Sequence, residues 1–289
     1  MGSAEKKPEA AATPEVEAKA KTRVVMLQNL GPQLPLGIVD SAKTYHKEIA
    51  ARVWKLGTER ELGDLRDKNR DSNFAQYVSM ILGTMCTKLG PHAFDGKPLA
   101  DKSVLVSQMY MADVLYAYIW LRVESLGPNL NVEVKCPTCN GTFPFAADLN
   151  TLEVTCADSV EAAQWDYTLK HPIKVRGREC KALRFGPTRW NAMESTSASQ
   201  FNSGQMKADI VRYSIHEVGH DGETFEAMPI SEHELDELSK FDFETLAYLI
   251  DKNAIGPDMS IKDKCRLCSR PFVTSIDWGY ESFFAISSP

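Results

Sequence analysis

The sequence predicts an α+β fold that consists of two homologous halves. The first observation is a Cys-x-x-Cys pair that occurs twice, at an offset of 129 residues from Cys136 to Cys265. The second is that this offset also aligns residues with demanding backbone geometry, chiefly Gly, Pro and residues at helix ends. The third is that strand-like and helix-like segments follow in the same order in both stretches. We interpret the pattern as an ancient tandem duplication; the alternative is coincidence combined with generic turn chemistry.

The alignment at this offset runs without a gap from about Leu56 to Asp148. Its matched positions are Leu56–Arg60 with Phe185–Arg189, Asp113 with Asp242, Gly127-Pro128 with Gly256-Pro257, and Phe143 with Phe272. It divides the chain into a first half, residues 23–150, and a second half, residues 151–289. Each half ends in one cysteine pair and the strand that follows it. The two halves are long enough for each to bury a core of its own.

Residues 1–22 are expected to form a disordered tail ahead of the first half. They are rich in Ala, Glu, Lys and Pro and contain no aromatic residue, so they offer little apolar surface to bury. They also lack the apolar central region of a signal peptide. A second loop is expected at Ser195–Gly204, where apolar residues are scarce.

Composition and charge exclude several classes of protein. The 289 residues include 39 acidic and 33 basic side chains, for a net charge of −6, and 43% of the residues are hydrophobic. These values are typical of a globular chain. The mild acidity argues against broad nucleic-acid binding, although it leaves room for a local basic patch. The most apolar stretch, Val114–Val123, is about half the length of roughly 20 residues that a membrane-spanning helix needs.

Each half begins with two segments rich in β-branched and aromatic residues, which predict strands. A helix start follows in each, supported by a capping box at Thr58 and Glu61 and by Pro187 in a first helical turn. Two longer helices come next; the first ends at a glycine and the last at Gly-Pro. For the first half, the predicted strands are Leu36–Asp40, Glu48–Trp54, Asn131–Lys135 and Thr142–Phe145, and the helices are Asn73–Leu89 and Ser107–Ser125.

The second half repeats this order. The predicted strands are Tyr167–Val175, Cys180–Phe185, Met259–Lys264 and Phe272–Asp277, and the helices are Lys207–Val218 and about Ser231–Asn253, with a break near Phe241. Strand, Cys-x-x-Cys turn and strand therefore close both halves. This is the layout of a hairpin with the two cysteines at its tip.

Four of the seven cysteines are candidate metal ligands: Cys136, Cys139, Cys265 and Cys268. Two intervening residues let both thiolates of a pair point at one ion, and four sulfurs complete a tetrahedral Zn²⁺ shell. A chain without a secretory signal is expected in a reducing compartment, where thiols bind metal more often than they form disulfides. We therefore predict a four-cysteine zinc ribbon that joins the two halves. With no open coordination position, the Zn²⁺ would be structural.

Three alternatives to the shared zinc ribbon remain at this point. The first is two separate incomplete sites that a partner chain fills, and the second is a ribbon that has lost its metal. A redox Cys-x-x-Cys motif is the third, but it requires a helix directly after the motif, and strands are predicted on both sides here.

The segment His216-Glu217-Val218-Gly219-His220 matches the H-E-x-x-H pattern of zinc peptidases. That chemistry needs both histidines on one face of a helix. Gly219 aligns with the helix-ending Gly90, and His220 precedes the turn dipeptide Asp221-Gly222, so the second histidine is expected beyond the helix end. A helix C-terminus, where a histidine complements the dipole, is the favoured interpretation. We assign no catalytic residue.

Three segments are candidate docking surfaces. The helix Asp113–Val123 is apolar almost all round, which indicates burial in the core of the first half or under a partner. The segment Gln28–Gly37 contains two prolines and is expected to be extended, with a possible docking role. The aromatic C-terminal segment Trp278–Ile286 suggests a docking strand, or alternatively internal packing.

The order of features resembles the baseplate hub and tail assembly-chaperone proteins of contractile-tailed phages and contractile injection systems. The resemblance rests on the opening Leu34–Asp40, the helix start Gly57–Leu62, the helix that leads into Cys136-Pro-Thr-Cys139, and the Phe143-Pro-Phe145 strand. It covers mainly residues 34–150. It implies a non-enzymatic protein that helps to build, or forms part of, a baseplate hub. The metal ligands carried over are Cys136, Cys139, Cys265 and Cys268.

We therefore predict a protein-interaction component or assembly chaperone whose partners are other tail, baseplate or injection-system proteins. The expected location is the cytoplasm of the bacterial host during assembly and then the particle. No nucleic acid, membrane span or small-molecule substrate is expected. Two alternatives stay open: a zinc-ribbon nucleic-acid adaptor using Lys262, Lys264, Arg266 and Arg270, and a zinc metallopeptidase using His216, Glu217 and His220.

Overall fold

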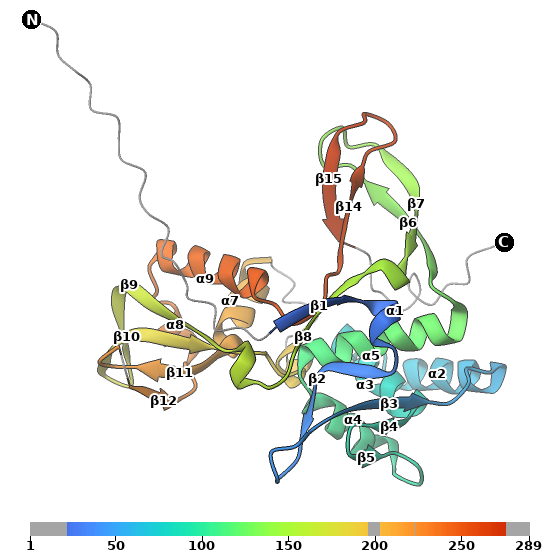
Figure 1. The fold of residues 1–289 in the computed structure, drawn as a ribbon, viewed down its shortest axis with the longest axis horizontal. Helices are drawn as coiled ribbons and strands as arrows, with labels where there is room; N and C mark the ends of the chain where they lie inside the picture. The colour runs from blue at the N-terminus through green and yellow to red at the C-terminus, as the bar shows by residue number, and fades with distance from the viewer. Residues whose placement is uncertain (1–21, 196–202, 223, 276–289) are drawn as a thin grey trace, which may run out of the picture.

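The computed structural model describes residues 22–195, 203–222 and 224–275, which form two lobes and a pair of projecting hairpins (Figure 1). We call residues 27–126 lobe 1, residues 165–252 lobe 2, and the hairpins at 129–148 and 260–275 the ribbon. The fold is a mixture of helices and antiparallel strands, as the sequence predicts.

Lobe 1 contains a four-stranded antiparallel sheet with the order β2-β3-β4-β5. Its strands are β2 (Gln33–Val39), β3 (Tyr45–Ala51), β4 (Cys86–Leu89) and β5 (His92–Ala93). Its helices are α1 (Leu27–Leu30), α2 (Leu56–Lys68), α3 (Phe74–Met85), α4 (Leu99–Ser107) and α5 (Met111–Leu126). A capping box fixes the start of α3: the Asn73 side chain accepts from the Gln76 N–H, and the Gln76 side chain accepts from the Asn73 N–H.

Helix α5 is the central element of the lobe 1 core. Tyr116, Tyr118 and Ile119 are completely buried, and the helix contacts the strand β2. The prediction that this apolar helix forms the core of the first half is confirmed. Segment 28–37, in contrast, was wrongly considered as a docking surface, because Leu34 and Leu36 are fully buried.

Lobe 2 contains a sheet with the order β12-β11-β10-β9, so its strands also add to the sheet in chain order. The strands are β9 (Trp165–Val175), β10 (Arg178–Phe185), β11 (Ile215–Gly219) and β12 (Phe225–Ala227). The helices are α6 (Asn191–Ser195), α7 (Ser203–Ser214), α8 (Glu232–Leu235) and α9 (Lys240–Lys252), and the break predicted near Phe241 falls between α8 and α9. A separate apolar core lies between this sheet and its helices.

A buried aspartate holds a helix against a strand in each lobe. The carboxylate of Asp113 accepts hydrogen bonds from the backbone N–H groups of Leu36 and Gly37 at 2.9–3.1 Å. The carboxylate of Asp242 accepts them from Lys170 and His171 at 3.0 and 3.3 Å. These two aspartates lie in the first turns of α5 and α9 and are completely buried.

The predicted ends of two helices were wrong. Helices α3 and α7 end at Met85 and Ser214. Each end lies five residues before the glycine that was expected to cap the helix, Gly90 or Gly219. The residues that follow are the strands β4 and β11, which pair with β3 and β10. The backbone groups of these residues form hydrogen bonds with the edge of a sheet. If the helices continued by one more turn, these bonds to the sheet would not form.

The helix starts predicted at Thr58 and Pro187 were also wrong. Helix α2 begins at Leu56 after Lys55, without a capping hydrogen bond from a side chain. Pro187 lies in an irregular segment before α6. Gly90 does adopt a left-handed conformation, with φ +55°, but it lies between β4 and β5 and not at a helix end.

A three-stranded sheet, β1-β8-β13, joins distant parts of the chain at the base of the ribbon. Its strands are β1 (Thr22–Met26), β8 (Glu153–Ala157) and β13 (Gly256–Pro257); single 3₁₀ turns lie at Leu149–Thr151 and Glu161–Ala163. Trp190, from the segment between β10 and α6, inserts into the lobe 1 core and donates its indole N–H to the Ala75 carbonyl and the Ser79 hydroxyl. The two lobes are therefore interlocked.

Two predictions fall on residues outside the described ranges. The expected tail comprises residues 1–22, of which only Thr22 is described, as the first residue of β1. The C-terminal segment Trp278–Ile286 also lies outside the described residues, as does most of the expected loop at Ser195–Gly204.

Replacing Asp113 with alanine should destabilise the protein by about 2–4 kcal/mol, because two buried backbone N–H groups lose their acceptor. Burial raises the pKa of Asp113 to about 6, above the value of 3.8 expected when it is unfolded. The folded protein therefore binds this proton more tightly, and the contribution of Asp113 to stability falls as the pH rises through this window. The loss caused by Asp113→Ala should be larger at pH 5 than at pH 7.5 in urea unfolding. Glu124→Ala, an exposed change on the same helix, should cost under about 0.5 kcal/mol.

Candidate metal centre

The ribbon consists of two hairpins that stand side by side away from the lobes (Figure 1). The first is formed by β6 (Asn129–Lys135) and β7 (Thr142–Asp148), and the second by β14 (Ser260–Lys264) and β15 (Pro271–Ser275). Pairing continues to the last residues before each turn, Lys135 with Thr142 and Lys264 with Pro271. Each Cys-x-x-Cys pair therefore lies in the turn at a hairpin tip, as the sequence predicts.

The two turns have the same hydrogen bonds. In the first, the Cys136 N–H donates to the Gly141 carbonyl at 2.9 Å and the Asn140 N–H donates to the Cys136 carbonyl at 2.9 Å. In the second, the Cys265 N–H donates to the Arg270 carbonyl at 2.9 Å and the Ser269 N–H donates to the Cys265 carbonyl at 2.8 Å.

Left-handed residues complete both turns. Asn140 has φ +57° and Ser269 has φ +58°, and each directly follows the second cysteine of its pair. This conformation reverses the chain after the second cysteine, so that both sulfurs of the pair lie on the same side of the turn. Asn tolerates it better than Ser does, because a short polar side chain that bonds locally offsets part of the steric cost.

The four sulfurs converge between the hairpin tips. All lie within 4.8 Å of one another, with 3.9 Å between the sulfurs of Cys136 and Cys268 and 3.8 Å between those of Cys139 and Cys265. Four ligands at about 2.3 Å from Zn²⁺ would be separated by about 3.8 Å along the edges of a tetrahedron. A disulfide requires about 2.05 Å. The cluster thus has the size of a metal site, and it removes the alternative of two separate incomplete sites.

Backbone N–H groups favour thiolate on one side of the cluster. Cys136 and Cys265 are buried, Cys268 is half-buried and Cys139 is exposed. The backbone N–H of Cys139, with that of Thr138, lowers the pKa of the Cys136 thiol to about 6. The Gly141 N–H acts in the same direction on Cys139, but desolvation by the surrounding residues and the neighbouring sulfurs raise the pKa of that thiol to about 11. The cluster therefore loses its first thiol proton easily and retains its last one. All four cysteines become thiolates only when a cation balances their negative charge.

An aromatic pair supports the cysteine cluster. The rings of Phe143 and Phe272 meet edge to face, with centroids 5.8 Å apart and planes at 87°. Both rings are buried, together with Val134 and Ile261 from the same hairpins. The 129-residue offset in the sequence matches the two phenylalanines, but their contact is visible only in the structure. Their pairing holds the hairpins face to face below the sulfurs.

The H-E-x-x-H segment does not form a peptidase site. His216 and Glu217 lie on the strand β11, and His220 directly follows it. Positions four apart on a strand are separated by roughly 13 Å, so the two histidines do not meet at one ion. The expectation that His216 lies at a helix C-terminus was wrong, because α7 ends at Ser214.

Glu217 and one ring nitrogen of His220 have structural partners. Glu217 forms an ion pair with Arg184 at 2.9 Å, and Nδ1 of His220 lies 2.7 Å from the Glu179 carbonyl. Burial lowers the pKa of His216. Together with Tyr110 and Arg189, His216 and Glu217 line a cleft between the lobes. Among the described residues, the four ribbon cysteines are the only cluster of three or more potential metal ligands.

The remaining cysteines lie apart from the ribbon. Cys86, Cys156 and Cys180 are buried, and burial raises the pKa of each, that of Cys86 to about 12. They are neutral at physiological pH and serve as small apolar side chains.

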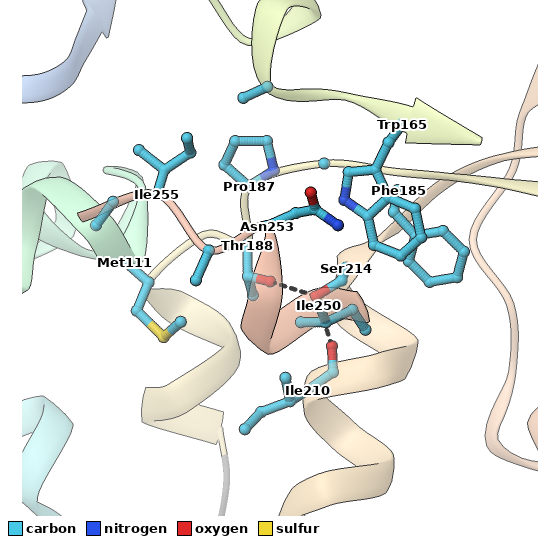
Figure 2. A pocket seen from close by; sticks show the side chains of 14 residues that line it. Met111, Trp165, Phe185, Pro187, Thr188, Ile210, Ser214, Ile250, Asn253 and Ile255 are labelled. Atoms are coloured by element: carbon cyan, nitrogen blue, oxygen red, sulfur yellow. Dashed lines mark hydrogen bonds between the residues drawn. The ribbon is translucent and has the colours of Figure 1, made fainter. Parts of the chain in front are cut away.

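A small cavity lies where the chain crosses between the lobes (Figure 2). Its volume is about 60 Å³, and its walls include the stacked rings of Trp165 and Phe185. The hydroxyls of Thr188 and Ser214 hydrogen-bond to each other at 2.8 Å, and Ser214 donates to the Ile210 carbonyl. The cavity wall contains no titratable side chain, so it offers no general acid or base.

These features define a two-lobed α+β protein in which a cysteine cluster joins hairpins from distant parts of the chain. A family model described as T4 bacteriophage base plate protein matches residues 38–285, which is most of the chain. The chain therefore belongs to this family of phage baseplate proteins, and the resemblance inferred from the sequence is confirmed at that level. Comparisons with curated proteins and with solved structures find no match.

The described residues contain no helix that is both long and apolar enough to cross a membrane.

Metal content should depend on the ribbon cysteines. We expect one zinc per chain in purified protein and none in Cys265→Ser, with full retention in Cys180→Ala and in His220→Gln. Because protons compete for the thiolates, zinc should be lost as the pH is lowered. Elemental analysis after gel filtration measures each value. Zinc that survives Cys265→Ser would contradict the four-cysteine site.

The left-handed residues should control how tightly the metal is held. Ser269→Gly removes the steric cost of the conformation, so zinc transfer to a chelator should be slowed or unchanged. Ser269→Val places a β-branched side chain at positive φ and should speed the transfer at least several-fold. The exposed Ser41→Val change offers a control outside the ribbon. Equal transfer rates for Ser269→Gly and Ser269→Val would show that the turn conformation does not limit the site.

Proposed function

We propose that Cys136, Cys139, Cys265 and Cys268 bind one structural Zn²⁺. Sulfur separations of 3.8 and 3.9 Å support the proposal, and soft thiolate ligands in a tetrahedral arrangement favour zinc. With four protein ligands, the ion has no position for water or substrate. Its role is to hold the two hairpins together. The N–H of Leu267 lies 3.4 Å from the Cys265 sulfur and would stabilise a bound thiolate.

The two halves, residues 23–150 and 151–289, are proposed to derive from a tandem duplication. Three pairs at the 129-residue offset support it: the buried aspartates Asp113 and Asp242, the left-handed Asn140 and Ser269, and the ring pair Phe143 and Phe272. The strand orders β2-β3-β4-β5 and β9-β10-β11-β12 add to this. The ribbon is then the point at which the two copies of one ancestral hairpin meet.

The proposed role is that of a non-enzymatic protein-interaction component or assembly chaperone of a baseplate hub, in a phage tail or a contractile injection system. The observation that carries it is the family match over residues 38–285. Its partners are other tail or baseplate proteins, and it acts in the host cytoplasm during assembly and then in the particle. The proposal includes no catalytic residue and no small-molecule substrate.

The nucleic-acid alternative relies on the basic residues of the ribbon. Lys264, Arg266 and Arg270 are exposed there, whereas Lys262 is neutralised by Asp258 at 2.6 Å. Three remaining cations give a small footprint next to a net charge of −6. Filter binding at low and high salt would reveal a phosphate-driven interaction by its steep salt dependence.

The assembly role predicts that the ribbon is required for complex formation. Co-expression of the full chain with the other baseplate proteins of its phage should give a complex on gel filtration. Cys265→Ser should abolish the complex, and Cys180→Ala should leave it intact. Mass spectrometry of purified particles then separates the two versions of the role, because a component is present in the particle and a chaperone is not. A complex that survives complete zinc removal would contradict the role of the ribbon.

A further inference from the structure

The ribbon carries an open groove whose lining residues all come from the two hairpins and none from the lobes. It is lined by Pro137, Lys262, Asp263, Lys264, Pro271, Phe272 and Val273, and its surface is mainly apolar. Val273 is 62% exposed, and Leu267 at the hairpin tip is 61% exposed. The ribbon therefore exposes apolar surface in the groove and at its tip.

The groove lies in a basic part of the chain. The ribbon tip, residues 135–141 and 262–271, contains Lys135, Lys262, Lys264, Arg266 and Arg270 but only one acidic residue, Asp263. Within the described residues, Lys264, Arg266 and Arg270 take part in no ion pair, although the whole chain is acidic. Four bound thiolates and one Zn²⁺ would contribute a charge of about −2, which does not balance these cations. The groove therefore suits a segment that is both acidic and apolar.

We propose that residues 276–289 of the same chain fill this groove. The segment contains two acidic residues, Asp277 and Glu281, and no Lys, Arg or His. It also contains six large side chains that are apolar or aromatic: Ile276, Trp278, Tyr280, Phe283, Phe284 and Ile286. Its charge and its aromatic content both complement the groove.

Residues 276–289 follow directly after a strand that lines the groove, so only a short connection separates them from it. Strand β15 ends at Ser275, two residues after Val273 of the groove. Fourteen residues can extend over roughly 46 Å, whereas the five residues of β15 span only about 17 Å. A reversal at Asp277–Gly279, which has the residue types of a turn, leaves enough chain to run back along the hairpin.

The short connection favours the same chain over a second copy. A tether of a few residues holds the segment at an effective concentration near the millimolar range, well above the concentration of other copies in solution. The hairpin also has free strand edges, because β14 and β15 pair only with each other in the described structure. Backbone pairing along such an edge adds to the apolar contact. A baseplate partner that binds the ribbon would first displace this segment; that consequence depends on the proposed function, whereas the intramolecular contact does not.

Photocrosslinking of the full chain tests the contact. With p-benzoylphenylalanine in place of Phe283, crosslinks should map to residues 262–273. Protein mixed from ¹⁴N-labelled and ¹⁵N-labelled chains should give crosslinks within one isotope only. In the double variant Lys264→Glu with Arg270→Glu, the yield should fall about tenfold, whereas Arg60→Glu with Lys97→Glu, a matched pair of exposed cations in lobe 1, should leave it unchanged.

Zinc content is measured on the same samples, so that loss of the ribbon is distinguished from loss of docking. A reduced yield with one zinc per chain supports the contact. Crosslinks to other residues, crosslinks between isotopes, or a yield unaffected by charge reversal despite full zinc would overturn it. Failure of the baseplate complex, measured separately, would not affect this result.

Discussion

The convergence of four sulfurs from two hairpins is the constraint on which the arrangement of this protein depends. The sulfurs belong to residues separated by more than a hundred positions, and 125 residues lie between Cys139 and Cys265. Closing so long a loop costs an unfolded chain several kcal/mol, so a metal bound at this point favours the folded state. The Phe143 and Phe272 rings add apolar contact below the sulfurs, but two short hairpins have little core of their own.

The ribbon is rigidly connected to lobe 1. Helix α5 leads into β6 after one short turn, where the buried side chain of Arg122 donates to the carbonyls of Gly127 and Asn129. These carbonyls lie beyond the helix end, and the guanidinium satisfies them without water. On the other side, β13 packs against the start of α5, and Gly256 allows the close approach: a Cβ there would lie 3.0 Å from Ala112. The base of the ribbon is therefore packed directly against the core helix.

Lobe 2 is held by fewer but specific contacts. Trp190 is fully buried in the core of lobe 1 although it follows the sheet of lobe 2 in sequence. Arg189 beside it stacks on the ring of Tyr110, and the backbone of the same segment pairs with residues 109–111. A protein that assembles with others benefits from this arrangement, because the relative position of two separate cores is fixed by packed side chains and not by a flexible linker.

The sequence by itself determined the features that depend on local chemistry. Cysteine spacing located both hairpin tips, the apolar α5 segment identified the core helix, and the 129-residue offset matched Asp113 with Asp242. The long-range features could not be derived in this way. The final residues of the helices predicted at 73–89 and 207–218 became strands because a sheet edge was available to them. The H-E-x-x-H segment became part of a sheet for the same reason.

Only the tertiary structure decided that the four sulfurs meet at one point, that Trp190 crosses into the other lobe, and that a basic, apolar groove lies beside the cluster. Each of these depends on the distance between residues far apart in the chain. Local propensity and spacing contain no information about that distance, because it is set by the packing of complete elements.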